Sequence, residues 1–154
     1  MMSLWSAWAL LLCGLGVAPL AWSASQALRA ERDSLARGMA VLLAQDMAHR
    51  LHLNTAAAAQ YQLAWGQVPA TSSCQDRPCS RTDWALADLT QWRLQVAQML
   101  PQGDAWLQAS GAGQSSRWLM LAWSSDAGRD AGLSANAPTR CPDGKRCQVW
   151  VLIP

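Results

Sequence analysis

The amino terminus of the chain is free of charge over an unusually long stretch. No Asp, Glu, Lys or Arg occurs between Met1 and Leu28, and the segment from Leu4 to Trp22 is almost wholly apolar. A helix of about 20 apolar residues is long enough to cross the hydrocarbon core of a membrane, which is about 30 Å thick. We therefore expect this segment to be a retained membrane anchor, with Trp5 and Trp22 as interfacial aromatic residues near its ends.

A cleaved signal peptide is the alternative interpretation of this segment, because small residues from Ala18 onward offer a cleavage region. A signal peptide carries a basic leader ahead of a shorter apolar run, and the absence of basic residues before Leu4 favours the anchor. Charge alone leaves the orientation open. Arg29, Arg32 and Arg37 follow the apolar segment, and the positive-inside rule by itself would place that end in the cytoplasm.

A helical pattern continues beyond the apolar segment. Apolar residues recur at intervals of seven and of four: Leu28, Leu35, Leu42, and Leu35, Met39, Leu43, Met47, Leu51. We interpret both series as one apolar face of a helix that runs to about Leu53. Pro19 is expected to kink this helix within the anchor, and Asn54 to end it in the left-handed conformation. The prediction is one helix of about 50 residues, or about 75 Å.

The rest of the chain predicts another helix and a small sheet. Apolar residues at helical spacing from Thr82 to Leu100 indicate a helix, and Ser80 with Asp83 is close to a capping box at its start. The period then changes to short apolar runs bounded by turn residues, at Ala105 to Ser110, Arg117 to Trp123 and Gln148 to Ile153. We interpret these runs as three antiparallel strands. The expected fold class is α+β, with the long membrane-spanning helix packed on a small domain that has a lateral helix and a short antiparallel sheet.

The cysteines predict a cross-linked domain. One of the five, Cys13, lies in the apolar segment, and four lie in the domain: Cys74, Cys79, Cys141 and Cys147. We favour two local disulfides, Cys74–Cys79 and Cys141–Cys147, because a turn holds each pair close. A crossed pairing and a zinc site built from the same four cysteines are the alternatives. Disulfides imply a periplasmic or extracellular location.

The sequence offers no pattern typical of an enzyme or of a nucleic-acid-binding protein. It contains no nucleophile elbow and no nucleotide-binding glycine loop, and a net charge of +2 gives no basic stripe for nucleic acid. We expect no catalytic residue, cofactor or metal, and we interpret His49 and His52 as surface residues. The chain has ten Trp and no Phe. The tryptophans of the predicted strands are expected in the core or at a partner interface: Trp106, Trp118, Trp123 and Trp150.

Most of the chain from about Leu28 to Trp123 resembles a known family. The residues from Ala44 to Asn54, followed by Tyr61, resemble the type IV pilus minor pilins of the V type, also called pilus modification proteins. That family has a similar Ala-x-Asp-Met-x-x-Arg stretch ending in Asn, where its long helix leaves for the globular domain. The lateral helix around Trp92 and its exit at Pro101 are also similar. The family-like positions are Ala44, Asp46, Met47, Arg50, Asn54 and Trp92.

The amino terminus departs from the pattern of that family. Prepilins carry a glycine at a cleavage site and a glutamate a few residues into the apolar segment, and here Met1 and Ser6 stand in those places. This departure argues against cleavage by prepilin peptidase. It also argues against the usual salt bridge to the amino terminus of a neighbouring subunit.

The resemblance implies a structural, non-enzymatic minor pilin in type IV pilus assembly, at initiation or at the fibre tip. Residues 1–28 would form the transmembrane and fibre-core half of the long helix, and residues 29–154 the periplasmic pilin-like domain with the rest of that helix. Small residues permit close helix packing, and the residues expected to anchor and pack the helix are Leu4, Trp5, Ser6, Trp8, Gly14, Gly16, Pro19 and Trp22.

The implied location is the bacterial inner membrane, crossed once, or the pilus fibre itself. The implied partners are other minor and major pilins and the inner-membrane assembly platform, with no nucleic acid. Two alternatives remain at this stage. One is a pseudopilin of a type II secretion system, and the other is a membrane-anchored periplasmic protein with a thiol or metal site.

Overall fold

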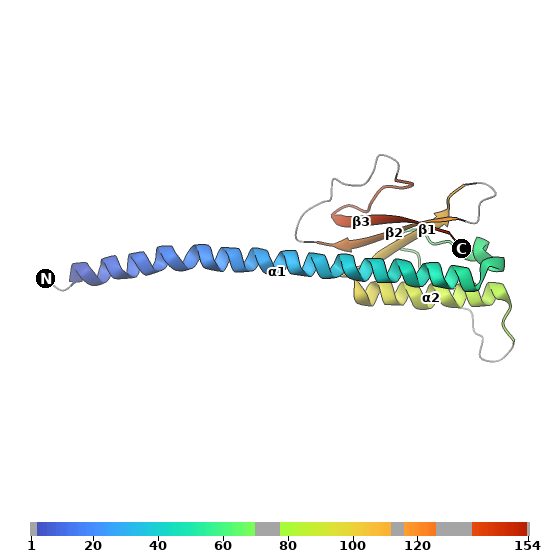
Figure 1. Cartoon of the computed structure of the whole chain (residues 1–154), viewed down its shortest axis with the longest axis horizontal. Coiled ribbons are helices and arrows are strands. Elements are labelled where there is room, and N and C mark those ends of the chain that lie inside the picture. Colours follow the sequence, from blue (N-terminus) through green and yellow to red (C-terminus); the bar gives the residue numbers. More distant parts are fainter. Residues whose placement is uncertain (1–2, 70–77, 112–115, 126–136, 154) are drawn as a thin grey trace.

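The chain folds into a long helix with a small α+β head around its carboxyl-terminal half (Figure 1). The computed structural model describes residues 3–69, 78–111, 116–125 and 137–153, with side chains from Trp22 onward. The elements in chain order are α1 (Ser3–Leu53), the 3₁₀-helix η1 (Thr55–Gln60), α2 (Arg81–Met99), β1 (Asp104–Ala109), β2 (Arg117–Ser124) and β3 (Lys145–Leu152). We use "head" for the elements from η1 to β3 together with the part of α1 that they cover. The predicted α+β class is confirmed.

The three strands form one antiparallel sheet in the order β1-β2-β3. Leu119 of β2 pairs with Leu107 of β1 on one side and with Trp150 of β3 on the other. The outer edge of β1 is covered in part, because Leu63 exchanges two backbone hydrogen bonds of 2.8 Å with Leu107. Among the described residues, no strand pairs with the outer edge of β3.

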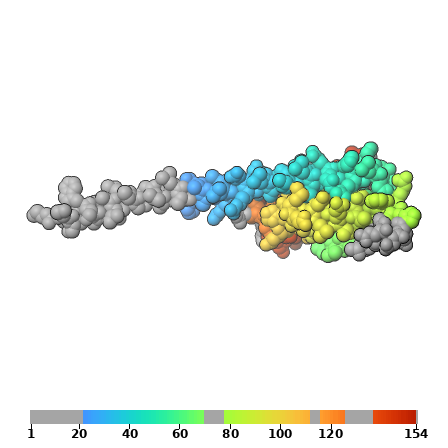
Figure 2. Space-filling model, turned by 90° about the horizontal axis from the view of Figure 1, so that it is seen from below, coloured from blue at the N-terminus to red at the C-terminus, as the bar shows by residue number. Residues whose placement is uncertain are grey.

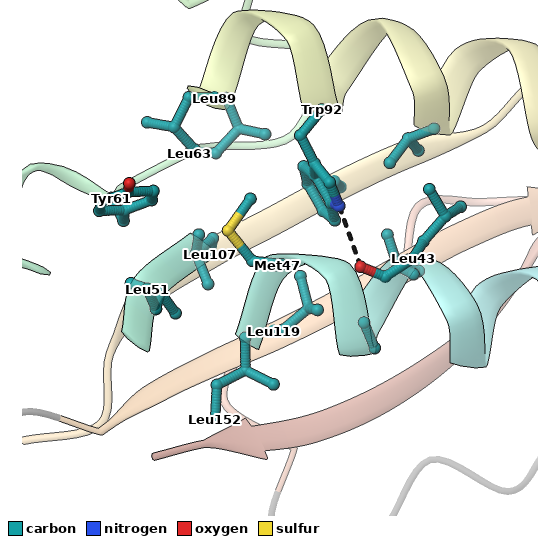
Figure 3. Close-up of a cluster of buried hydrophobic side chains, with 14 of the residues drawn as sticks. Leu43, Met47, Leu51, Tyr61, Leu63, Leu89, Trp92, Leu107, Leu119 and Leu152 are labelled. Carbon is teal, nitrogen blue, oxygen red and sulfur yellow. Dashed lines mark hydrogen bonds between the residues drawn. The ribbon is translucent and has the colours of Figure 1, made fainter. Parts of the chain in front are cut away.

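Both long helices pack on one face of this sheet. α1 lies against β2 and β3, α2 lies against β1, and the two helices lie side by side (Figures 1 and 2). The side chains between these layers form the core shown in Figure 3, which includes Met47 and Leu51 from α1, Leu89 and Trp92 from α2, and Leu107, Leu119 and Leu152 from the sheet. Trp92 is fully buried, and its Nε1–H donates a hydrogen bond of 3.0 Å to the carbonyl of Leu43.

The tryptophans of the strands divide between the two faces of the sheet. Trp123 lies in the core with 1% exposure, and Trp150 packs against the core from β3. Trp106 lies on the opposite face, where it packs with Trp65 against a smaller cluster around Met120. Burial between the layers therefore accounts for only part of the tryptophan content of the head.

The predicted apolar face of α1 is only partly correct. The core takes Leu43, Met47 and Leu51 with the small residues Ala36, Ala40 and Ala44, but the leucines at intervals of seven are exposed: Leu28 56%, Leu35 58% and Leu42 55%. At 3.6 residues per turn, each four-residue step rotates by about +40° and each seven-residue step by about −20°. Leu35 and Leu51 therefore point about 160° apart. The two series form two different faces, of which only one meets the head.

The ends of the two helices are fixed by side chains. Ser80 caps α2 in a full capping box with Asp83, as the sequence predicts. The prediction that Asn54 ends α1 in the left-handed conformation is wrong, because its φ is −131°. Asn54 is instead buried, and its Nδ2–H donates 2.8 Å to the carbonyl of Arg81 at the start of α2. Its side chain thus joins the end of one helix to the start of the other.

The turn after α2 requires a glycine. A Cβ atom at Gly103 would lie 2.3 Å from the carbonyl oxygen of Val96 and 2.8 Å from the Cβ of Leu100. No side chain can be accommodated at such distances without moving the backbone. The chain can therefore turn directly from α2 into β1, which brings that strand beneath the helix.

The predicted anchor falls almost entirely outside the described side chains. Among those that are described, which begin at Trp22, no helix is both long and apolar enough to cross a membrane. The predicted kink at Pro19 and the predicted packing role of Gly14 and Gly16 also lie outside the described side chains. Trp22 itself is 69% exposed.

We expect the replacement Trp92→Phe to destabilise the head strongly. It removes a buried hydrogen-bond donor and leaves a cavity in the core, which together cost about 2 kcal/mol. Trp84→Phe is the matched control, because Trp84 lies on the same helix and is 56% exposed. Guanidinium unfolding of the full chain in nonionic detergent measures both. Equal stabilities of the two variants would contradict the core shown in Figure 3.

Candidate functional site at the end of the long helix

Charged and polar side chains from three elements meet where α1 ends. The guanidinium of Arg50 donates to Asp46 Oδ2 (2.8 Å), one turn earlier on α1, and to Asp88 Oδ1 (3.0 Å) on α2. The hydroxyl of Tyr61, just after η1, donates to Asp88 Oδ2 at 2.6 Å. We call Asp46, Arg50, Asn54, Tyr61 and Asp88 the junction cluster.

The junction cluster is shielded from water to different degrees. The Arg50 side chain is 15% exposed, that of Asp88 25% and that of Asp46 40%. Tyr61 is fully buried. Burial, followed by the hydrogen bond to the Asp88 carboxylate, raises the pKa of Tyr61 well above its usual value. Tyr61 therefore stays protonated and donates to Asp88 over the whole physiological pH range.

The remaining family-like residues support the same junction from the core. Ala44 and Met47 are buried on the face of α1 that meets the head, and Trp92 hydrogen-bonds the backbone of α1 from α2. The structure therefore brings all six family-like residues to one region, where α1 and α2 pack against each other. Gln95 adds a longer contact of 3.4 Å to Arg50.

A second group of ion pairs connects α1 to the sheet, nearer the amino terminus of α1. Asp33 pairs with Arg146 of β3 and with Arg37 (3.0 Å) one turn later, and it accepts a hydrogen bond from Ser125 (2.8 Å). Burial alone would raise the pKa of Asp33, but the Ser125 hydrogen bond and the charges of Arg146 and Arg37 outweigh it and hold that pKa below its usual value. The sheet is thereby fixed to α1 at a point distant from Arg50.

Two more arginines bind the outer elements of the head. The guanidinium of Arg93 on α2 pairs with Asp104 at 2.8 Å, and Asp104 also accepts from the backbone of Gly66. Arg117 at the start of β2 is buried, and its Nε–H donates 3.1 Å to the carbonyl of Ala58 in η1. Burial lowers the pKa of Arg117. These contacts tie the loops to the sheet and form no reactive centre.

The cysteines whose side chains the structure describes are oxidised. A disulfide joins Cys141 and Cys147 across the turn that precedes and opens β3, which is one of the two predicted local bridges. Cys79 is also disulfide-bonded. Cys74 lies outside the described residues, so the pairing of Cys74 with Cys79 stays a prediction.

This disulfide removes alternatives that the sequence left open. A zinc site needs all four domain cysteines as thiolates, and Cys141 and Cys147 are bonded to each other. The same bond excludes a crossed pairing of these two with Cys74 or Cys79. Within the described ranges, no group of three His, Cys, Asp or Glu side chains could hold a metal ion, and both His49 and His52 are exposed.

Several members of these networks could not be identified from sequence patterns. Asp33, Asp104, Arg117 and Arg146 carry no motif, and their partners lie far away in the chain. The one local signal was the four-residue spacing of Asp46 with Arg50 and of Asp33 with Arg37, which places each pair on one side of a helix. That spacing predicts a pair and cannot reveal the third partner across the fold.

Comparison with known proteins agrees with this geometry. Residues 24–90 match the family model of the Tt1218-like proteins, described as type IV pilin Tt1218. The matched segment contains the whole junction cluster, the end of α1, η1 and the first half of α2. Over this segment the chain is similar to the type IV pilins. No curated protein and no solved structure matches it significantly.

We expect Arg50→Met to destabilise the head far more than Arg37→Met. Each arginine follows an aspartate by four residues on α1, but Arg50 is 15% exposed and Arg37 54%. Loss of Arg50 leaves two neighbouring carboxylates without their cation and costs about 2–3 kcal/mol. Loss of the exposed Arg37 leaves Asp33 paired with Arg146 and costs about 0.5 kcal/mol. Guanidinium unfolding of both variants in detergent measures the difference. Similar losses would show that the junction cluster does not brace the fold.

We also expect Asp33 to make the stability of the head sensitive to acid. A carboxylate whose folded-state pKa is lowered stabilises the fold above its unfolded pKa, and that contribution is lost as the pH falls through the folded-state value. The free energy of unfolding should therefore drop less steeply below pH 3.8, the usual aspartate value, in Asp33→Asn than in the wild type. Asp143→Asn, at an exposed turn, is the control and should keep the wild-type slope. If the free energy of unfolding of Asp33→Asn falls with pH as steeply as that of the wild type, Asp33 is not the source of the acid sensitivity.

Proposed function

We propose that the chain is a membrane-anchored minor pilin that takes part in type IV pilus assembly as a structural, non-enzymatic subunit. The observation that carries this proposal is the combination of one 51-residue helix with a head that covers only its carboxyl-terminal half. The family match over residues 24–90 supports it, because it covers the joint between these two parts.

The anchor is proposed from the charge-free residues 1–28, which lead without interruption into the covered part of α1. The proposed arrangement is a single pass through the bacterial inner membrane with the head in the periplasm. The Cys141–Cys147 disulfide supports that side, because such bonds persist in oxidising compartments. Gly14 and Gly16 would allow neighbouring helices to approach closely within the membrane or the fibre.

The exposed leucines of α1 support lateral packing with other subunits. Leu28, Leu35 and Leu42 lie within about 40° of one another around the helix and are each more than half exposed. A row of exposed leucines at sevens is typical of a helix that packs against another helix. The proposed partners on this row are the long helices of other minor and major pilins, which the inner-membrane assembly platform brings together.

This function predicts that the leucine row is needed for fibre formation. A clean deletion of the gene in its own bacterium should abolish or sharply reduce surface fibres, and the wild-type gene should restore them. The variant Leu35→Gln/Leu42→Gln should fail to restore fibres, and it should lose chemical cross-links to other pilins. Leu94→Gln is the control, because Leu94 on α2 is as exposed as Leu35, each at 58%.

The outcomes separate the proposed function from its rivals. Normal fibre number and motility in the deletion strain would overturn a role in pilus assembly. A defect in protein secretion with normal fibres would instead assign the chain to a type II secretion system. Protein that is found free of the membrane, with the segment before about residue 23 removed, would overturn the anchor.

A further inference from the structure

A pocket lies between α1 and the end of β2. Figure 1 shows that this end of the head is the one nearest the amino-terminal half of α1. Its volume is about 210 Å³, and Arg29, Arg32 and Ala36 of α1 line one side. Trp123 and Ser124 of β2 line the other side. At about 30 Å³ per water molecule, this volume has room for a small polar group of several heavy atoms.

The lining of the pocket is mainly apolar and includes two positively charged side chains, Arg29 and Arg32. Among the described residues, Arg29 and Arg32 form no ion pair, and both are exposed toward solvent. Trp123 is 1% exposed, and its Nε1–H is buried without a hydrogen-bond acceptor among the described residues. The indole therefore reports on the wall of the pocket and is not counted as a donor to an occupant.

The carboxylate in the wall of the pocket is already neutralised. Asp33 is held by Arg146 and Arg37 and accepts the hydroxyl of Ser125. The charge of Asp33 is therefore not available to Arg29 and Arg32. The occupant that fits is an anion with several acceptor oxygens and no donor, which can take charge-assisted hydrogen bonds from both guanidinium groups.

The position of the pocket along α1 indicates the source of this anion. Arg29 follows Trp22 by seven residues, or about 10 Å of helix. Side chains of a helix lean toward its amino terminus, which brings both arginines closer to the anchor. The polar layer outside the hydrocarbon core is about 5–8 Å thick on each side. If Trp22 lies at the membrane interface, the backbone of Arg29 lies just beyond this polar layer, and its long side chain can reach back to the lipid phosphates.

We propose that this pocket binds the phosphate of a phospholipid headgroup and so fixes the height and rotation of the head at the membrane surface. The inference rests on the anchoring proposed above. It goes beyond anchoring by an apolar segment, because a bound phosphate would hold the head in one orientation. A free helix in the bilayer can rotate about its own axis.

The test uses the full chain with ¹⁵N-labelled tryptophan in a phosphate-free sugar detergent. Three probes are added separately: dihexanoyl-phosphatidylglycerol, inorganic phosphate and acetate. We expect the short-chain lipid to shift the indole N–H resonance of Trp123 and to bind in calorimetry. Arg29→Gln/Arg32→Gln should weaken that binding by about tenfold or more. Arg81→Gln, an exposed arginine away from the pocket, should bind like the wild type.

Each other outcome overturns the proposal. A response to acetate but not to the lipid would assign the pocket to a carboxylate of another protein subunit. A response to inorganic phosphate but not to the lipid would leave a site for a free anion. If nothing binds, or if Arg29→Gln/Arg32→Gln binds the lipid as tightly as Arg81→Gln, the pocket is not a lipid site. Calorimetry measures this binding without the assignment of the Trp123 resonance. The probes are soluble, so lipid binding is measured independently of fibre formation. If the chain binds the lipid but takes no part in fibre formation, the proposed pilus function fails and the lipid site remains.

Discussion

The contact between α1 and α2 depends on Arg50. Its guanidinium faces acceptors from α1 and α2, and one of them, Asp88, also holds the hydroxyl of Tyr61. Arg50 compensates the charges of Asp46 and Asp88. Without its guanidinium, these two carboxylates would be left near each other with the same sign, and the fold would lose stability. The burial of Tyr61 completes the arrangement, since a protonated hydroxyl is the one form that can donate to Asp88.

The apolar core is one of two features that position the head along α1. The side chains that face the sheet include three alanines, Ala36, Ala40 and Ala44, which allow close approach but form a smooth surface. The charged ties at Asp33 and Arg50 lie 17 residues apart, or about 25 Å of helix. A shift of the head by one helical turn would break both ties at once. Polar contacts therefore add to the apolar core in setting the register between α1 and the head.

Local patterns in the sequence predicted most of the elements. The capping box at Ser80 and the turn residues around the strands were sufficient for α2 and the sheet, because these signals act within a few residues. The predicted apolar face of α1 is partly wrong. Leucines at intervals of seven indicate an apolar face of a helix, but the spacing does not show whether the head or another helix covers that face. The pairs Asp33–Arg146 and Arg50–Asp88 join residues 113 and 38 positions apart. A single sequence carries no record of such distant contacts.

No strand among the described residues pairs with the outer edge of β3, and this edge affects how copies of the head can meet without aggregating. Exposed strand edges invite pairing with other strands and so promote disordered aggregation. Here the edge begins with Lys145, and the cross-link between Cys141 and Cys147 turns the incoming chain sharply at the same point. A charged side chain and a constrained entry both discourage strand-to-strand addition. Both features disfavour pairing of two copies of this head through β3, which leaves the helices as the surfaces through which copies can meet in order.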